Sequence, residues 1–439
     1  MNAFLSGLRP LILRGLPVYV FLSAYLGLTV LGNVIYVSPL GDEFWRVAGA
    51  DPLPMKAVSD ISFWLLLFLP LMVCPISFWI GKLMAPIVKA TAPHIPEIPR
   101  SVYVVVTTLL FLYVAIRLGQ THAVSQFLSA TNDIEAVNKR FQLLQELGFL
   151  PQMVMKSLLV FLAVYAWARS PAERGYFWLI AALTTTIALA ICLILLNMKW
   201  PLVLFIILIG VSAFAFSRER PFANLIIVTC IGAVAYLLLS VAVLRMSPID
   251  SVRSRPLDVA RSVGAATLEH YPRLLAVAIN RMAIAAPYYY DMPASISNEC
   301  APRLGRLWIE RKLECEPTLL VYAKIFPDDH YVEPGTSPAA ANLYGYALAG
   351  WSGAIICSVA VMIVLGFFLA LLPAIHGHPL AAATFVMGAY AAYFFSQLPL
   401  EGALVYDHGM WWLLLIAAYL AISGTLRLTC RTRQRFQAR

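Results

Sequence analysis

Long runs of apolar residues are the feature that most constrains how this chain can fold. A helix rises about 1.5 Å per residue, so roughly 17 to 25 consecutive apolar residues are needed to cross the hydrocarbon core of a bilayer. About ten runs meet this length, each bounded by charged, proline or aromatic residues. The sequence therefore predicts an all-α polytopic integral membrane protein with about ten transmembrane helices. The expected limits are 16–38, 61–81, 101–117, 151–168, 175–197, 200–217, 222–245, 345–372, 380–398 and 409–427.

Composition excludes the alternative of an ordinary soluble domain. Hydrophobic residues make up 61% of the 439 residues and charged residues only 13%, and the mean hydropathy is +0.77. Soluble domains carry about one quarter charged residues. Too few charged side chains are present to cover a core of this size in water, so the apolar surface must face lipid.

The positions of lysine and arginine predict the orientation, because these residues accumulate on the cytoplasmic side in short loops. With the amino terminus inside, Glu97, Glu173 and Glu219 are the acidic residues of the inner segments. The basic residues of the same segments are Arg9, Arg14, Lys82, Lys89, Arg100, Arg169, Arg174, Arg218, Arg220, Arg427, Arg431, Arg433, Arg435 and Arg439. Both termini are therefore expected in the cytoplasm, and the net charge of +9 favours anionic lipid rather than nucleic acid as its partner.

This orientation divides the chain into four parts. Helices one to seven occupy 1–245, a large loop on the outer side occupies 246–344, helices eight to ten occupy 345–427, and a basic cytoplasmic tail occupies 428–439. The large loop is the only segment long enough to fold as a subdomain. Its cysteines Cys300 and Cys315 are expected to form a disulfide in an oxidising outer compartment, the alternative being two unpaired thiols.

Within this loop, the stretch 274–290 is apolar but too short and too interrupted to span a membrane. We interpret it as a re-entrant or interface-lying helix. Arg281 lies at its centre, where a guanidinium group is costly unless it meets an anion, so Arg281 is a candidate functional residue. The alternative is an arginine that extends to the surface or pairs with Asp291.

Four other basic residues are expected at the same outer boundary. Arg117 ends the third run, Lys139 and Arg140 lie in the loop that follows, and Lys199 lies in the turn between two helices. Together with Arg281 they could line a positive cavity that binds a phosphate or pyrophosphate group through charge-assisted hydrogen bonds. Taken one at a time, each is better explained as an interfacial anchor.

Three stretches resemble the bacterial O-antigen polymerases. They are NMKWPLVLFIILIG at 197–210, INRMAIAAPYYYDM at 279–292 and PGTSPAAANLYGYALAGWSGA at 334–354. The layout of many helices with one dominant outer loop is also similar. The resemblance implies a GT-C type, metal-independent glycosyltransferase of the bacterial inner membrane whose active site faces the periplasm.

The same resemblance implies the substrate and the partners. Oligosaccharide repeat units linked to undecaprenyl pyrophosphate would serve as donor and acceptor, with a chain-length regulator protein as a further partner and no cofactor. Arginines of the periplasmic loops are the functional residues of the family, and Arg281 is the best match. Guanidinium groups stabilise the negative charge that develops on a departing pyrophosphate without any proton transfer.

A base that accepts the proton of the acceptor hydroxyl is expected in the run PDDHYVEPG at 327–335. His330 is the first candidate, with Asp329 and Glu333 beside it; the alternative is a solvated acidic turn. Tyr288, Asn342 and His408 are expected to contact sugar, although for Tyr288 the role of an interfacial anchor comes first. We find no strong metal-ligand spacing and no nucleotide-binding motif.

Other functions remain open at this stage. An O-antigen ligase would use the same donor with a different acceptor, and its sequence would look similar. A flippase or transporter of lipid-linked sugars usually shows two related halves and charged residues at mid-membrane. Here the ionisable residues, Lys156 included, gather at the outer interface. A non-catalytic scaffold is a third alternative, which the position of Arg281 disfavours.

Overall fold

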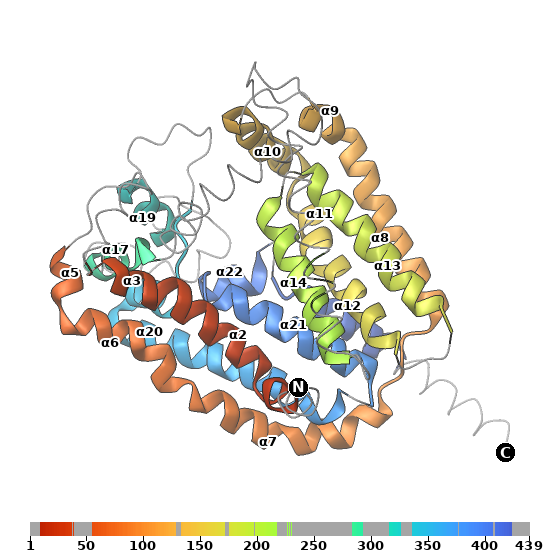
Figure 1. The fold of residues 1–439 in the computed structure, drawn as a ribbon, viewed down its shortest axis with the longest axis horizontal. Coiled ribbons are helices and arrows are strands. Elements are labelled where there is room, and N and C mark those ends of the chain that lie inside the picture. Colours follow the sequence, from red (N-terminus) through yellow and green to blue (C-terminus); the bar gives the residue numbers. More distant parts are fainter. Residues whose placement is uncertain are drawn as a thin grey trace.

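The computed structural model describes residues 9–36, 38, 55–128, 133–171, 175–196, 198–216, 226, 228, 230, 283–292, 316–325, 336–375, 377–406 and 409–423. These residues form helices joined by turns, and no β-strand is found among them (Figure 1). The all-α class predicted from the apolar runs is confirmed for this part of the chain.

Six helical stretches of the described residues are long and apolar enough to cross a membrane. They are Leu16–Ile35, Ile61–His94, Arg100–Gln120, Phe149–Arg169, Phe177–Leu195 and Ala341–Ala374. Three shorter apolar helices, Trp200–Phe216, Pro379–Phe395 and Trp412–Ser423, match further predicted runs. The run 222–245 lies almost entirely outside the described residues, so the number of ten spans stays a prediction.

Some of these stretches consist of several helices and others of a single one. Their bounds are α2 (Leu16–Tyr25) with a π-helical turn (Leu26–Val30) and α3 (Leu31–Tyr36), α6 (Ile61–Val73) with α7 (Pro75–Thr91), α8 (Arg100–Gln120), α11 (Phe149–Met153) with a π-helical turn (Val154–Leu158) and α12 (Leu159–Arg169), α13 (Phe177–Leu195), α14 (Lys199–Phe216), α20 (Ala341–Leu369) and α21 (Pro379–Phe395). The second stretch continues well beyond the predicted end at 81, because Pro75 occupies the first turn of α7, where its missing N–H costs nothing.

Short helices lie beside the long ones. They are α5 (Met55–Ser59), α9 (Ala123–Leu128), α10 (Asp133–Leu147), α17 (Ala285–Asp291), α19 (Pro317–Ile325) and α22 (Leu400–Val405). We call the end of the bundle that holds α10 and α19 the outer end (Figure 1), and the end where Arg9 and His378 line a common cavity the inner end, following the predicted orientation.

The centre of the bundle is formed by α12 and α21. Every residue of α12 from Leu159 to Ala166 is buried, and α21 is buried along nearly its whole length. α12 packs against α13, α14 and α21, while α21 also packs against α2. These two helices are apolar on all sides because protein surrounds them, as expected for interior helices.

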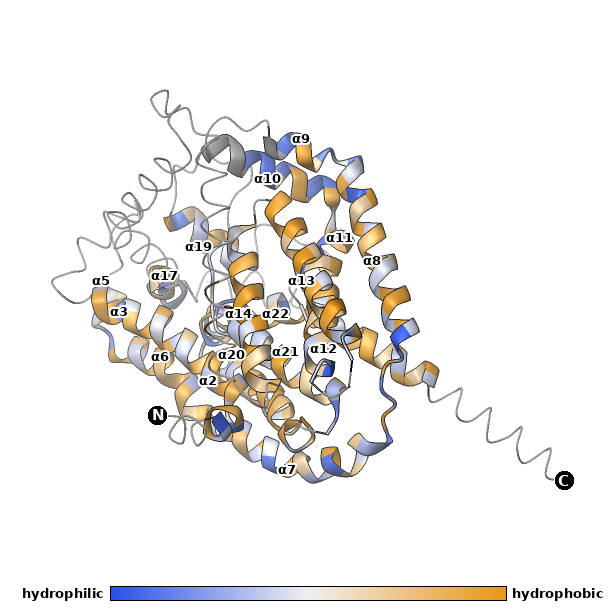
Figure 2. Cartoon of the chain, turned by 45° about the vertical axis from the view of Figure 1, so that its right-hand side comes forward, coloured by the Kyte–Doolittle hydropathy of each residue, from blue (hydrophilic) through white to orange (hydrophobic). Residues whose placement is uncertain are grey.

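The peripheral helices α8 and α13 carry apolar side chains on their exposed surfaces. On α8 these are Val105, Leu109, Leu112 and Ile116, and on α13 they are Ile180, Leu183, Ile187 and Ile191. The spacing of three or four residues places each set on one face of its helix. Hydrophobic colours cover most of both helices, whereas α10 is largely hydrophilic (Figure 2). Two continuous apolar faces of this kind are surfaces for lipid tails.

A second apolar cluster lies at the outer end, apart from the main core. α17, α19 and the first turns of α20 pack together with α5 and the start of α6 around Phe63, Tyr289 and Leu343. The described part of the stretch predicted as re-entrant or interfacial, 283–290, forms α17 and is buried in this cluster. Part of the large loop therefore folds against the outer ends of the membrane helices.

Helix α20 differs from the single run predicted at 345–372. It begins at Ala341, and its helical geometry is interrupted at Ala349 and Gly350, where Gly350 has φ of 61°. Glycine is the residue that adopts this left-handed conformation at little cost. The break sends the first two turns in a different direction from the rest, so Gly345 and Gly353 meet backbone to backbone.

Candidate functional site

A cavity of about 520 Å³ opens at the outer end of the bundle. We call it the outer cavity. It lies between the end of α10, α11, the start of α19, the residues that precede α20, and the turn from α21 to α22, all labelled in Figure 1 except the turns. The lining residues are Leu144, Gln145, Gly148, Phe149, Gln152, Glu316, Thr318, Thr336, Ser337, Pro338, Leu398, Pro399, Gly402 and Tyr406.

The wall that comes from the large loop is fixed by hydrogen bonds to three different elements. The backbone N–H of Ser337 donates to the carbonyl of Thr318 at 2.9 Å, and the backbone N–H of Ala339 donates to the carbonyl of Gln397 at 3.0 Å. The hydroxyl of Tyr289 on α17 donates to the carbonyl of Ser337 at 3.1 Å. The segment before α20 is therefore held in place from α17, α19 and the end of α21.

One carboxyl group lines this cavity and a second lies on a neighbouring helix. Glu316 lines it and accepts a hydrogen bond from the hydroxyl of Thr318 at 2.9 Å. Glu401 lies on α22 directly before Gly402, a lining residue, and accepts a hydrogen bond from the hydroxyl of Tyr344. Burial raises the pKa of the Glu401 carboxyl, and the negative charge of Glu316 adds to the increase. A desolvated carboxyl next to a second one is suited to holding and releasing a proton.

A buried lysine stands behind the cavity wall. Lys156 is only 5% exposed, and its Nζ donates to Oε1 of the lining residue Gln152 at 3.0 Å. It lies in the π-helical turn that joins α11 to α12. Ser157 of the same turn donates to the carbonyl of Gly409 at 2.7 Å. π-helical turns inside α-helices occur frequently at functional sites, and here the turn brings an ammonium group beside the outer cavity.

Three of the predicted cations lie close to α10, whose last turns line the cavity. The guanidinium of Arg117 donates to Oε1 of Gln120 at 2.9 Å and to the carbonyls of Glu146 and Leu147 at 3.2 and 3.3 Å. Arg117 thus caps the carbonyl end of α10, where positive charge is favoured. Its predicted role in substrate binding is untested.

Lys139 and Arg140 lie on α10 itself, and the guanidinium of Arg140 stands 4.9 Å from the ring centre of Phe141. Lys199 is the first residue of α14, and its side chain lies outside the described part of the structure. The convergence of these cations with Arg281 on one phosphate stays a prediction.

Asn342 and Tyr288, both predicted to contact sugar, lie away from the lining of the outer cavity. The amide of Asn342 is 1% exposed and donates to the hydroxyl of Tyr25 and to the carbonyl of Leu66, each at 2.9 Å. It therefore joins α20 to α2 and α6 inside the bundle. Tyr288 is half-buried on α17. The structure gives Asn342 a role in helix packing, which its sequence context did not indicate.

Several predicted site residues lie outside the described residues. These are Arg281, Asp329, His330, Glu333, His408, Cys300 and Cys315. Their predicted roles, the disulfide included, stay predictions. Within the described ranges, no group of three or more histidine, cysteine, aspartate or glutamate side chains could hold a metal ion.

The sequence interpretation did not single out Glu316, Glu401 or Tyr344. A signal for Glu401 was present, because it is an acidic residue in the otherwise apolar segment LPLEGALVY between two predicted helices. No such signal existed for the electrostatic interaction between Glu316 and Glu401, which are far apart in the chain and come close only in the folded protein.

Comparisons with known proteins give no relative. No protein-family model, no curated protein sequence and no solved structure matches the chain.

Proposed function

We propose that this protein polymerises oligosaccharide repeat units carried on undecaprenyl pyrophosphate, at the outer face of a bacterial inner membrane. The observation that carries the proposal is which segments of the chain come together at the outer cavity. Two of the three stretches that resemble the O-antigen polymerases meet there: residues 336–338 line the cavity, and Tyr289 holds Ser337 in place.

The chemistry of the cavity also suits glycosyl transfer. In this reaction the bond between the anomeric carbon and the pyrophosphate oxygen breaks, and the acceptor hydroxyl oxygen bonds to the anomeric carbon. The hydroxyl proton must pass to a base. Glu316 lines the cavity and is the described carboxylate best placed to accept it. His330, Asp329 and Glu333 remain the candidates from the sequence.

The pyrophosphate leaves with negative charge, which requires fixed positive groups near the departing oxygen. We assign this role to Arg281, with Lys156 as a described cation close to the cavity. The polyprenyl tail of the substrate would lie in the bilayer along apolar helix faces such as those of α8 and α13. The sugar would then enter the outer cavity from the membrane surface.

The test is the length distribution of the surface polysaccharide in a strain that lacks the gene. Wild-type protein should restore a ladder of bands on a gel, whereas Arg281→Ala and Glu316→Gln should leave single repeats at matched protein levels in the membrane. Arg14→Ala is the matched control, since Arg14 is an exposed arginine at the inner end. Arg281→Lys keeps the charge and separates loss of folding from loss of the guanidinium.

Each outcome distinguishes the functions considered. A deletion strain without any attached sugar favours a ligase or a flippase over a polymerase. A ladder that the deletion leaves unchanged contradicts all three functions. A ladder restored equally well by Arg281→Ala contradicts the role of Arg281 but leaves the polymerase in place.

A further inference from the structure

A second cavity, of about 490 Å³, opens at the inner end of the bundle. We call it the inner cavity. The outer cavity lies at the start of α11 and the end of α21, whereas the inner cavity lies at the end of α12 and the start of α21. Among the residues that line it are Arg9, Glu97, Arg169, Phe216 and His378. The two cavities are therefore at opposite ends of the same two helices.

Arg9 brings the first positive charge to the inner cavity. Its Nη2 donates to the carbonyl of Ala215 near the end of α14 at 2.7 Å, and this bond fixes the direction of the side chain. Its Nε is buried and has no hydrogen-bond partner among the described residues. A guanidinium offers five N–H donors in one plane, so donors of Arg9 remain for an acceptor that enters the cavity.

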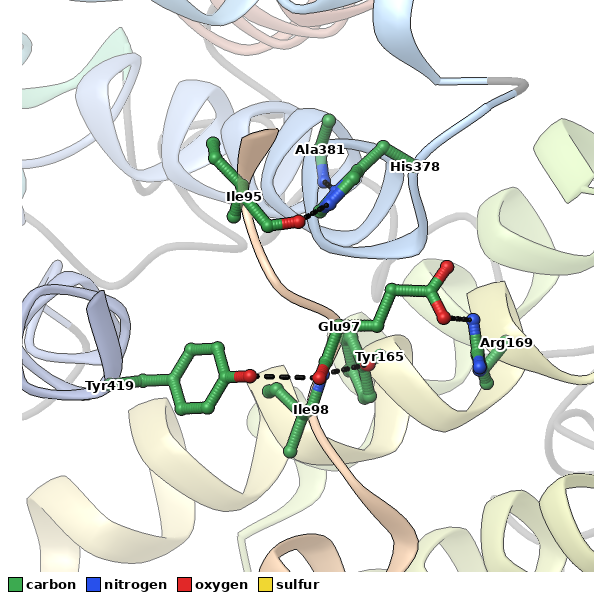
Figure 3. Close-up of polar contacts among 8 residues, drawn as sticks. All are labelled: Ile95, Glu97, Ile98, Tyr165, Arg169, His378, Ala381 and Tyr419. Atoms are coloured by element: carbon green, nitrogen blue, oxygen red, sulfur yellow. Dashed lines mark hydrogen bonds and ion pairs between the residues drawn. The ribbon is translucent and has the colours of Figure 1, made fainter. Parts of the chain in front are cut away.

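Arg169 brings the second positive charge. It forms an ion pair with Glu97 and lies over the ring of Trp178, with 5.8 Å between the guanidinium carbon and the ring centre. Arg169 is 17% exposed, whereas Glu97 is 42% exposed. Figure 3 shows the Glu97 carboxylate directed at Arg169 from the segment that leads into α8. The carboxylate orients Arg169 and neutralises one of the two guanidinium charges.

The segment that carries Glu97 is fixed at three points (Figure 3). The hydroxyl of Tyr419 donates to the carbonyl of Glu97 at 2.8 Å, and the hydroxyl of Tyr165 accepts the backbone N–H of Ile98 at 3.1 Å. Nε2 of His378 lies 3.0 Å from the carbonyl oxygen of Ile95. This wall of the inner cavity is thus held rigidly before any ligand arrives, which lowers the entropic cost of binding.

His378 uses both ring nitrogens at this cavity. The backbone N–H of Ala381 donates to Nδ1 of His378 at 3.4 Å, so Nδ1 is the acceptor. With Nδ1 as the acceptor, Nε2 donates to the carbonyl of Ile95. Among the residues that the structure describes, the charged side chains that line the inner cavity are Arg9 and Arg169 against Glu97, and their sum is positive.

We propose that the inner cavity binds the phosphate group of an anionic phospholipid headgroup, with Arg9 and Arg169 as the donors. Guanidinium groups bind phosphate oxygens through two parallel charge-assisted hydrogen bonds. The cavity lies at the end of Phe149–Arg169, a helical stretch long and apolar enough to span a membrane, and the headgroup region begins where such a span ends. Anionic lipids are abundant in the cytoplasmic leaflet, which this end of the protein is predicted to face. The proposal does not depend on the function assigned to the outer cavity.

The experiment measures binding to the purified full-length protein in detergent. The probe is dihexanoyl phosphatidylglycerol below its micelle concentration, compared with dihexanoyl phosphatidylcholine and inorganic phosphate. Phosphatidylglycerol should bind more tightly than phosphatidylcholine. Arg9→Gln should weaken phosphatidylglycerol binding by roughly tenfold, the loss of one charge-assisted contact. Arg9→Lys keeps the charge but not the planar donors, and should give a smaller loss.

Two further variants separate a built site from general attraction to a basic surface. Arg14→Gln removes the same charge five residues away from an exposed position that does not line the cavity, and it should leave the affinity within about twofold. Glu97→Gln removes the competing carboxylate from Arg169 and should strengthen binding.

Three outcomes decide the proposal. An equal loss in Arg9→Gln and Arg14→Gln, or no loss in either, overturns it. Phosphatidylcholine bound as tightly as phosphatidylglycerol overturns the preference for an anionic headgroup. Inorganic phosphate bound as tightly as phosphatidylglycerol, with the same dependence on Arg9, supports the phosphate site but assigns it to a soluble phosphate rather than to a lipid.

Discussion

Some of the polar residues inside this protein join helices, and Glu401 differs from these. Asn342 connects three helices, and Tyr103 shares a hydrogen bond with Thr185 between α8 and α13 at 3.0 Å. Glu401 instead carries an ionisable group whose charged form is disfavoured by burial. Hydrogen bonding to Tyr344 offsets this only in part, so the pKa of Glu401 stays above its usual value of 4.5.

This shift predicts how stability depends on pH. Because the folded protein binds the Glu401 proton more tightly than the unfolded chain does, the contribution of Glu401 to stability is complete below pH 4.5 and is lost as pH rises through the raised pKa. Glu401→Gln cannot titrate and should lack this loss. The measurement is the thermal unfolding temperature of the wild type and of Glu401→Gln in detergent, from pH 4.5 upward.

The matched control for this experiment is Glu146→Gln, a change to an exposed carboxylate of α10. Its unfolding temperature should follow that of the wild type at every pH. Parallel pH profiles for the wild type and Glu401→Gln would mean that Glu401 is not desolvated in the folded protein.

At the scale of elements, the break in α20 is the feature that most depends on particular residues. Gly350 supplies the left-handed conformation, and Gly345 and Gly353 let the two parts of the helix approach each other. A Cβ atom on Gly353 would lie 2.9 Å from the carbonyl carbon of Gly345 and closer still to its oxygen. Neither atom can rotate away, because both belong to the backbone.

Gly353→Ala should therefore destabilise the protein by about 1–3 kcal/mol, the usual cost of inserting a methyl group where no space exists. Gly119→Ala is the control. Gly119 lies in α8, and no atom lies within 4 Å of the place that its added methyl group would take, while alanine favours the helix by up to about 1 kcal/mol. Unfolding in a titration with denaturing detergent measures the stability of both variants. Equal stability of Gly353→Ala and Gly119→Ala would contradict the close approach of Gly345 and Gly353 in α20.

At the scale of the whole molecule, the segments that the charge rule places in the cytoplasm come together at one end. Arg9, Glu97, Arg169 and His378 belong to four different segments, all predicted to be inside, and they line one cavity. Segments predicted to be outside line the other. The shared location agrees with the grouping of these segments on one side, and a measurement in the cell must decide which side is the cytoplasm.

Cysteine labelling provides that measurement. In a background with the seven native cysteines replaced, Gln145→Cys should react with a membrane-impermeant maleimide in spheroplasts. Arg14→Cys should react only after lysis, since it is exposed at the predicted inner end. The reverse pattern would place the outer cavity in the cytoplasm and contradict the proposed function.

The sequence alone determined the class of this protein and the approximate places of most of its helices. Bilayer thickness fixes the length of an apolar run, and the cost of burying charge confines lysine and arginine to the ends, so both signals are local in the chain. The apolar runs matched six long helices and three shorter ones to within several residues, except that the second helix continues to His94 rather than ending at 81.

Only the tertiary structure decided which polar side chains lie together. Glu316 and Glu401, or Arg9 and Arg169, are separated by long stretches of chain, and no local pattern relates them. Helix packing brings them together through contacts between apolar faces whose partners the sequence does not specify. The break in α20 also could not be predicted from a local pattern. Gly345 and Gly353 are needed because their backbones lie against each other, and only the folded structure shows this contact.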